Sequence, residues 1–275
     1  EFKKKKMSLI NISQEIEFLE DTFMHKGVSH PAAVCKTDFG IAWVNTLGCY
    51  LYDGKRVSNL LEKGGRQIIK ESDWDSFVVE PMIGYIPKKR QIIVVDDITN
   101  NGDGSVFLYD MVTQSWVKGG AATIADQNKT NFITDWNGDL VYAHSTGTIL
   151  KWDDASDSSE LASAITKDID FGQPGVRKKV YRVYVTYKGA SDTNMDVFFD
   201  VDGGTSLNKT FANGTNITSD QLDGSSAWAV AELKPSTSSQ ANNIKSFRLK
   251  FVSDGATPAD FEINDISIAY RLKHI

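Results

Sequence analysis

Closely spaced aspartates are the residues of this sequence best suited to acid–base chemistry. Four pairs occur along the chain: Asp73 and Asp75, Asp96 and Asp97, Asp153 and Asp154, and Asp168 and Asp170. A glycosidase uses two carboxylates at a defined separation across its sugar cleft. Aspartate is also favoured at turns and strand ends, where its carboxylate accepts hydrogen bonds from nearby backbone N–H groups. We interpret the four pairs as turn residues and predict no catalytic residue.

Two oxygen-rich loops resemble calcium-binding segments. Residues 97–104 carry Asp, Thr, Asn and Asp at alternate positions, and residues 200–204 read Asp-Val-Asp-Gly-Gly. An EF-hand loop needs a glutamate at its twelfth position, but the twelfth residue counted from Asp97 is Leu108. We interpret both loops as glycine-rich turns, with a calcium site as the alternative.

Other metal-binding and nucleophilic residue types are sparse. The four histidines, which are scattered apart from the first two, are His25, His30, His144 and His274. The two cysteines, Cys35 and Cys49, are too few for a disulfide framework and are predicted to be free, buried thiols. The sequence has no P-loop, G-x-S-x-G, G-x-G-x-x-G, H-E-x-x-H or C-x-x-C motif. We therefore predict a protein that is not an enzyme and has no metal or cofactor.

The charge distribution also limits the function. Through residue 160 the chain has 17 Lys and Arg against 23 Asp and Glu, and after it 13 against 13, so the acidic excess lies in the first part. An acidic protein has no general attraction for nucleic acid or anionic membranes. The run from Lys3 to Lys6 is the exception, and we interpret it as a solvated tail or surface strand. No apolar stretch reaches the roughly 18 to 20 residues of a membrane span, and no signal-peptide core follows the lysines.

The aspartates of the first part belong to a repeated pattern. Residues 41–53, 92–110 and 140–153 each read as an apolar strand, a turn and a second strand ending in an aromatic residue and an aspartate. The closing aspartates are about 57 and about 43 residues apart, which brackets the period of four-stranded propeller blades. The side chains expected between the sheets are Phe39, Ile41, Trp43, Tyr52, Val94, Tyr109, Tyr142 and Trp152. Closed propellers have four to eight blades, so about three imply either a ring completed by other residues or an open stack covered by another chain.

Residues 9–26 are ambiguous. Ile12, Ile16 and Leu19 fall at helical spacing, whereas Ile10 with Ile12 alternates as in a strand. The segment alone favours a helix, and the repeats around it favour strands.

The pattern changes after the polar run 154–159. Residues 179–188 and 247–251 alternate apolar and polar side chains, with Tyr181 expected on the same face as Val183. Residues 261–272 change phase once, which a β-bulge at Asn264-Asp265 explains. We predict an all-β protein of two domains, with partial propeller-like blades in residues 1–159 and a jelly-roll-like β-sandwich in residues 160–275.

Several segments resemble a family of virion proteins. Residues 39–54, 167–179 and 263–273 are similar to tail nozzle and tail-hub proteins of short-tailed bacteriophages, which combine a propeller-like domain with a β-sandwich. The resemblance implies a non-catalytic subunit of a homo-oligomeric ring, expected to be a hexamer, in the virion tail. It implies contacts with other tail proteins, synthesis in the host cytoplasm, and DNA passing through without sequence-specific binding. An acidic wall that repels phosphate would let DNA slide.

Two other functions stay open. A carbohydrate- or receptor-binding module would use exposed aromatic rings as stacking platforms, and the candidates are Trp74, Trp116 and Trp228. A glycan-cleaving enzyme would use the paired aspartates.

Overall fold

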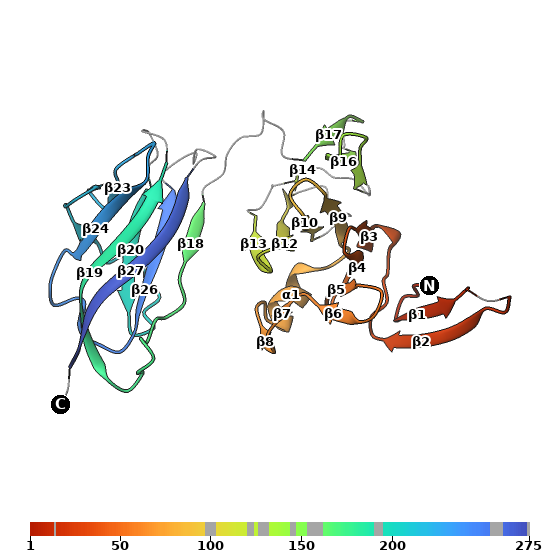
Figure 1. Ribbon diagram of the computed structural model, residues 1–275, viewed down its shortest axis with the longest axis horizontal. Coiled ribbons are helices and arrows are strands. Elements are labelled where there is room, and N and C mark those ends of the chain that lie inside the picture. Colours follow the sequence, from red (N-terminus) through yellow and green to blue (C-terminus); the bar gives the residue numbers. More distant parts are fainter. Residues whose placement is uncertain are drawn as a thin grey trace. The chain divides into compact units, whose positions relative to one another are not determined.

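The computed structural model shows an almost entirely β chain, as predicted (Figure 1). It describes residues 1–13, 15–96, 103–119, 124–125, 132–143, 147–152, 162–189, 195–253 and 261–273. The chain divides into two compact units, Glu1–Ala155 and Ser156–Ile275. The polar run 154–159 lies outside the described residues, so the boundary between residues 159 and 160 stays a prediction. Within the described residues, no helix is long and apolar enough to cross a membrane.

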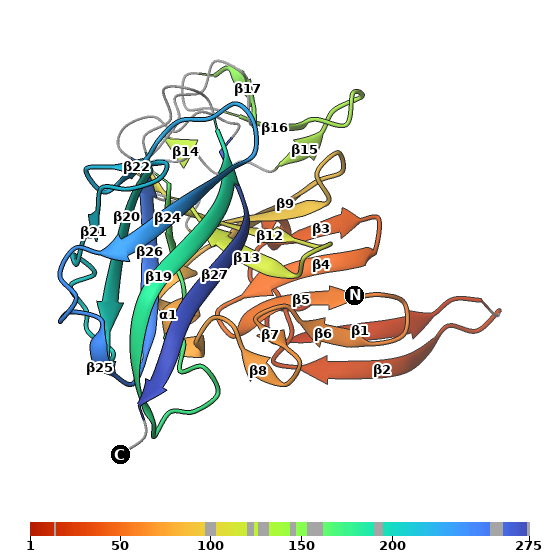
Figure 2. The same cartoon turned by 60° about the vertical axis from the view of Figure 1, so that its left-hand side comes forward.

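The first unit is built from antiparallel meanders (Figure 2). The first meander consists of β3 (Val34–Thr37), β4 (Gly40–Asn45), β5 (Gly48–Tyr52) and β6 (Val57–Asn59). The second consists of β9 (Met82–Ile86), β10 (Gln91–Val95), β12 (Val106–Asp110) and β13 (Ser115–Lys118). The third has β15 (Ile133–Thr134), β16 (Leu140–Ala143) and β17 (Ile149–Lys151). Within each meander, each strand pairs antiparallel with the next strand named, while the propeller-like arrangement stays a prediction.

Short elements connect these sheets. They are the 3-10 helix η1 (Pro31–Ala33), the helix α1 (Glu71–Phe77), and the two-stranded ladders β7 (Glu62–Lys63) with β8 (Arg66–Gln67) and β11 (Asp103–Gly104) with β14 (Ile124–Ala125). Trp74 on α1 is buried in the cluster that also holds Val44 of the first meander and Val94 of the second. The helix therefore closes the core that these two meanders share.

The side chains expected to pack between the sheets differ in their burial. Trp43, Val94 and Tyr109 are buried, and Tyr52, Tyr142 and Trp152 are half-buried at the core edges. The prediction was wrong for Phe39 and Ile41, which are exposed. Ile41 shares a face of β4 with Trp43, but it remains 41% exposed, whereas Trp43 is fully buried.

The described residues between 9 and 26 contain two strands and no helix, so the helical alternative was wrong. β1 (Lys6–Asn11) and β2 (Phe18–Met24) pair as an antiparallel hairpin. Met7 and Phe23 face each other across the ladder and pack on Trp43 and Tyr50. This tertiary contact at the base of the hairpin outweighs the weak helical spacing, which includes residues of the exposed tip.

The second unit contains two antiparallel sheets that share one core. One sheet has the order β18 (Ser163–Ile165), β26 (Phe247–Ser253), β20 (Met195–Val201), β23 (Gln221–Leu222), β22 (Ile217–Thr218). The other has β21 (Phe211–Ala212), β24 (Ala229–Pro235), β19 (Arg177–Lys188) and β25 (Asn242–Ile244), with β27 (Glu262–Lys273) paired to β19. Their inward residues form a single buried cluster that includes Val183, Phe199 and Leu249. The layered arrangement agrees with the predicted all-β class, while the jelly-roll topology stays a prediction.

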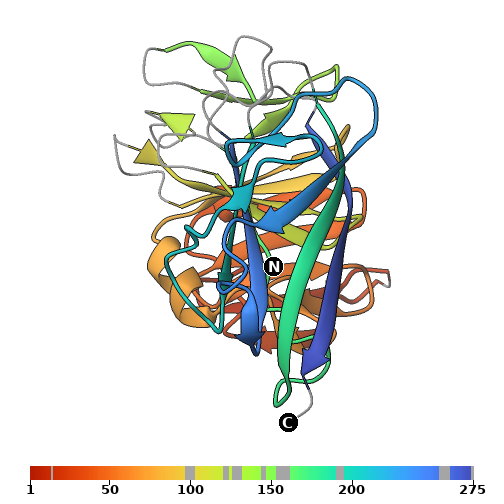
Figure 3. The same cartoon turned by 90° about the vertical axis from the view of Figure 1, so that its left-hand side faces the viewer.

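The long strands β19 and β27 lie side by side (Figure 3). Their ladder contains two bulges. Asn264 is the extra residue on β27, because Thr186 pairs with Asp265 and Tyr187 with Ile263. This confirms the predicted bulge. A second bulge at Tyr181 was not predicted: it shifts the phase of β19, so Val180 and Val183 face the core and Tyr181 is exposed. The prediction that Tyr181 shares a face with Val183 was therefore wrong.

Candidate functional site

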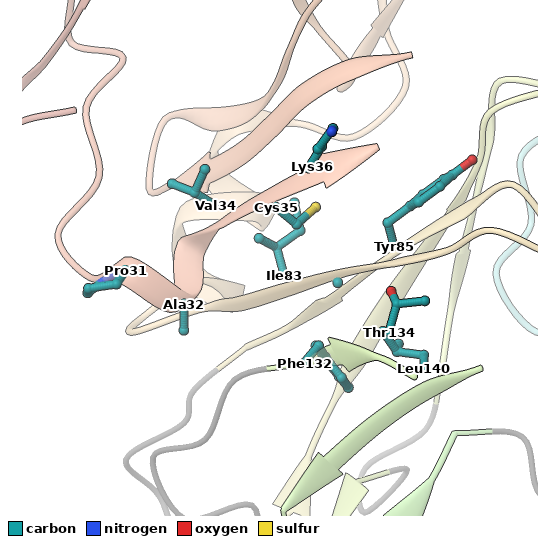
Figure 4. Close-up of a pocket in the computed structure, with 11 residues that line it drawn as sticks. Pro31, Ala32, Val34, Cys35, Lys36, Ile83, Tyr85, Phe132, Thr134 and Leu140 are labelled. Carbon is teal, nitrogen blue, oxygen red and sulfur yellow. The ribbon is translucent and has the colours of Figure 1, made fainter. Parts of the chain in front are cut away.

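A pocket of about 360 Å³ lies where the three meanders of the first unit meet. Its lining comes mainly from the first strand of each meander, β3, β9 and β15, and from η1. Figure 4 shows Val34 and Cys35 on one side and Phe132 and Leu140 on the other. Side chains from residues far apart in the sequence thus converge because each meander presents its first strand to the same place.

Gly84 allows this convergence. A Cβ atom at Gly84 would lie 2.8 Å from the Cβ, Cγ and Cδ2 atoms of Phe132, which is closer than side chains approach. The ring of Phe132 therefore packs directly against the backbone of β9. Phe132 also packs against Tyr142, with ring centroids 5.9 Å apart, and so connects the third meander to the second.

The ionisable groups of the pocket are held in unreactive states. Burial raises the pKa of the Cys35 thiol to about 12, so the thiol stays protonated near neutral pH. Burial and a 2.9 Å hydrogen bond from its hydroxyl to a carboxylate oxygen of Asp38 raise the pKa of Tyr85 to about 12. Lys36 is exposed. The pocket can enclose a small apolar group, but these side chains supply no activated nucleophile.

Both cysteines are free thiols. Cys49 is buried, and burial raises its pKa strongly. Strand β4 lies between β3, which carries Cys35, and β5, which carries Cys49. A disulfide between them would require a rearrangement of the sheet.

The predicted carboxylate pairs do not come together as a site in the described residues. Asp73 and Asp75 are exposed on α1. Asp170 accepts a 2.9 Å hydrogen bond from the Gly172 backbone N–H, and Asp168 accepts one of 3.2 Å from the Ser246 hydroxyl. In the other two pairs, Asp97, Asp153 and Asp154 lie outside the described residues. Residues 97–102 of the first oxygen-rich loop lie outside them as well.

The second oxygen-rich loop is a turn tied by protein donors. Asp200 is buried and accepts hydrogen bonds from the Val201 N–H at 2.9 Å and the Leu207 N–H at 3.2 Å, and it pairs with the Lys209 ammonium. Burial acts to raise the pKa of Asp200, but these donors outweigh it and hold the pKa below its usual range. Asp202 accepts from the Ser246 N–H at 3.1 Å. The carboxylates thus stabilise the loop, as the glycine-rich turn interpretation predicts.

The histidines that the structure describes also have local roles. His30 caps η1, its Nδ1 accepting from the Ala32 N–H at 3.1 Å. His25 has a left-handed backbone conformation with φ of 63° after β2. His144 and His274 lie outside the described residues. Within those residues, no group of three His, Cys, Asp or Glu side chains is arranged to hold a metal ion.

Two of the three predicted tryptophan platforms belong to the core. Trp74 is buried and donates a 2.9 Å hydrogen bond from its indole to the Asn45 carbonyl. Trp116 packs against it and donates to the Leu60 carbonyl at 2.8 Å. The expectation that these two are exposed was wrong, because turns bring backbone acceptors to both indole N–H groups. Trp228 is exposed, with the Lys188 ammonium 5.6 Å from its ring centroid.

Sequence reasoning missed Gly84, Phe132 and Asp38. A glycine inside an apolar strand signals close approach of another group, and residues 82–86 read Met-Ile-Gly-Tyr-Ile. That signal identifies Gly84 but not its partner, which is 48 residues further along the chain.

No protein-family model matches the chain, and no curated protein sequence matches it.

Proposed function

We propose that the protein is a non-catalytic structural subunit of a bacteriophage tail, at the nozzle, the hub or a related ring. Copies of the chain would surround part of the DNA conduit, with six-fold symmetry and contacts to other tail proteins. DNA would pass without sequence-specific binding. The residues of the first and second units that resemble nozzle and hub proteins motivate this proposal.

The uncovered side chains of the third meander are the observation that carries it. Trp136 is 100% exposed and Ile149 75% exposed, and Ile133 and Leu150 are also exposed. Apolar side chains gathered on one small sheet are typical of a surface that another protein covers. The opposite arrangement holds at the first meander, where the base of the β1–β2 hairpin covers Trp43. An open stack of meanders with one uncovered end favours assembly with further copies or neighbouring tail proteins.

The state of the ionisable groups supports a role without catalysis. The Cys35 thiol and the Tyr85 hydroxyl have raised pKa values, and both residues line the pocket between the three meanders. Asp168, Asp170 and Asp200 accept hydrogen bonds within their own loops or from neighbouring strands. Carboxylates with such hydrogen bonds stabilise the local structure and are poorly suited to proton transfer to a substrate.

Particle imaging with mass photometry tests the proposal. We expect rings of the purified chain, or a defined position for it in tail density. Substitution of Trp136 and Ile149 by serine should reduce assembly, whereas Trp228→Ser, which changes an exposed tryptophan of the second unit, should not. A strictly monomeric protein that is absent from virions would overturn the proposal.

A carbohydrate- or receptor-binding module is the second candidate, and Trp228 favours it. Its indole is 52% exposed, so the open part of the ring can serve as a stacking platform for a ligand. Loss of glycan binding in Trp228→Ala, with unchanged folding, would promote this candidate.

A further inference from the structure

Four positively charged side chains lie on one face of the ladder that β19 and β27 form. Arg177 pairs with Lys273, and Lys179 pairs with Arg271. Residues directly opposite in an antiparallel ladder have neighbouring side chains, and residues two apart share a face. Like charges opposite each other destabilise a sheet, and here two such pairs are adjacent. We call Arg177, Lys179, Arg271 and Lys273 the cationic patch.

The surroundings of the cationic patch increase its positive potential. Among the residues that the structure describes, no carboxylate forms an ion pair with any of its four side chains. Glu232, which lies opposite Tyr184 further along β19, pairs with Arg182 and Lys234. Lys178 lies on the opposite, buried face of β19, where backbone carbonyls of Gln173 and Lys245 accept from its ammonium. An anionic partner would relieve the repulsion between these charges.

Aromatic surface adjoins the patch. The bulge at Tyr181 exposes that ring, and the Lys179 ammonium lies 4.9 Å from its centroid. A partner suited to this face therefore combines negative charge with apolar side chains.

The tip of the β1–β2 hairpin has that combination. Residues 7–24 contain four acidic residues, Glu15, Glu17, Glu20 and Asp21, and no lysine or arginine. The acidic side chains are exposed, and so are the apolar residues among them: Ile12 is 73% exposed and Ile16 79%, and Phe18 and Leu19 are also exposed. The distal half of the hairpin extends beyond the meanders (Figures 1 and 2). A two-stranded hairpin gains little stability by itself, so exposed apolar residues at its tip favour a partner.

We propose that the acidic, apolar hairpin tip of one copy binds the cationic patch of the next copy. Carboxylates of Glu15, Glu17 and Glu20 face the guanidinium and ammonium groups of the patch, and the apolar tip residues contact Tyr181. The two surfaces lie on different parts of the chain, so the contact is head-to-tail and generates a ring when it closes. This inference rests on the proposed ring function and identifies one interface of that ring.

Complementary charge reversal tests the contact in the full chain. One variant reverses three charges of the hairpin tip, and the other reverses three charges of the patch. The first carries Glu15→Lys, Glu17→Lys and Glu20→Lys, and the second carries Arg177→Glu, Lys179→Glu and Arg271→Glu. Each variant alone then places like charges across the interface, and we expect its oligomer fraction to fall by about tenfold or more. In an equal mixture, both kinds of contact between the two variants have opposite charges, so oligomers should return with the two chains in equal number. Mass photometry and native mass spectrometry measure this.

The control is Lys167→Glu, which reverses an exposed lysine in the same unit as the patch and should leave assembly unchanged. Circular dichroism verifies that all variants are folded. Rings that persist in both reversal variants would overturn the hairpin contact while leaving the ring function standing, whereas a monomeric wild-type chain would overturn both. Failure of the mixture to assemble would overturn the pairing of these two surfaces. If the patch variant assembles normally but no longer binds duplex DNA that the wild-type chain binds, the patch would instead be assigned to phosphate binding.

Discussion

Asp53 and Asp110 make the same turn at equivalent positions in two meanders. The Oδ1 atom of Asp53 accepts 2.9 Å hydrogen bonds from the backbone N–H groups of Lys55 and Arg56. The Oδ1 atom of Asp110 accepts from those of Val112 at 2.9 Å and Thr113 at 2.8 Å. Each turn connects the third strand of its meander to the fourth. In these two meanders, the aspartate that ends the sequence repeat therefore forms the turn between the third and fourth strands.

This relationship predicts the effect of Asp110→Ala. The substitution removes two hydrogen bonds to backbone donors at an exposed turn, and we expect the free energy of unfolding to fall by about 1 kcal/mol. Asp110→Asn retains an acceptor oxygen and should cost less. Urea denaturation followed by tryptophan fluorescence measures both. Equal losses for the alanine and asparagine variants would contradict the role of the side-chain oxygen.

The buried Asp200 predicts how the second unit responds to acid. Its pKa is lowered in the folded state, because the donors around it outweigh the effect of burial. A lowered pKa stabilises the fold above the pKa of the unfolded chain, near 4. That contribution is lost as the pH falls through the folded value. We expect unfolding curves of the wild type between pH 2 and 6 to show this loss.

Asp200→Asn provides the matched comparison. It should be less stable than the wild type at pH 6, since the Lys209 ammonium loses its charged partner. Its stability should change less between pH 4 and 2, because one titrating group is gone. An unchanged acid dependence would assign the loss to other carboxylates.

The local pattern predicted much of the fold, as particular residues show. The alternation of Phe247, Leu249 and Phe251 places all three in the core of the second unit, and the phase change in residues 261–272 identified the bulge at Asn264. These features depend on one strand and its period. The β-class of the protein follows from the same information.

Features that depend on two distant segments were not predictable. The bulge at Tyr181 is defined by the register of β19 against β27, and nothing in residues 179–188 alone marks it. Trp74 and Trp116 stand among polar neighbours in the sequence, so their burial depends on the Asn45 and Leu60 carbonyls that receive their N–H groups. The pocket lined by β3, β9 and β15 likewise exists only when three meanders meet.

Trp74 and Trp228 form a matched pair for testing the core against the surface. Trp74→Ala removes a buried indole and its hydrogen bond, and we expect a loss of about 3–5 kcal/mol. Trp228→Ala changes an exposed side chain and should alter stability by about 0.5 kcal/mol or less. Chemical denaturation of both variants measures this. Trp74→Phe keeps an aromatic ring and should recover part of the stability that Trp74→Ala loses. Comparable losses for Trp74→Ala and Trp228→Ala would contradict the assigned burial.

Gly84 predicts a steric effect that a second substitution relieves. Gly84→Ala places a methyl group 2.8 Å from the Phe132 side chain, and overpacking of this kind costs about 1–3 kcal/mol. Gly175→Ala is the control, because a Cβ atom there meets nothing within 4 Å. In the Gly84→Ala background, Phe132→Ala removes Cγ and Cδ2, two of the three atoms that crowd the new methyl group, and should restore some stability. The same change alone in the wild type should be destabilising. Thermal unfolding of the four variants gives the coupling between the two positions. Additive effects of Gly84→Ala and Phe132→Ala would show that the two residues do not touch.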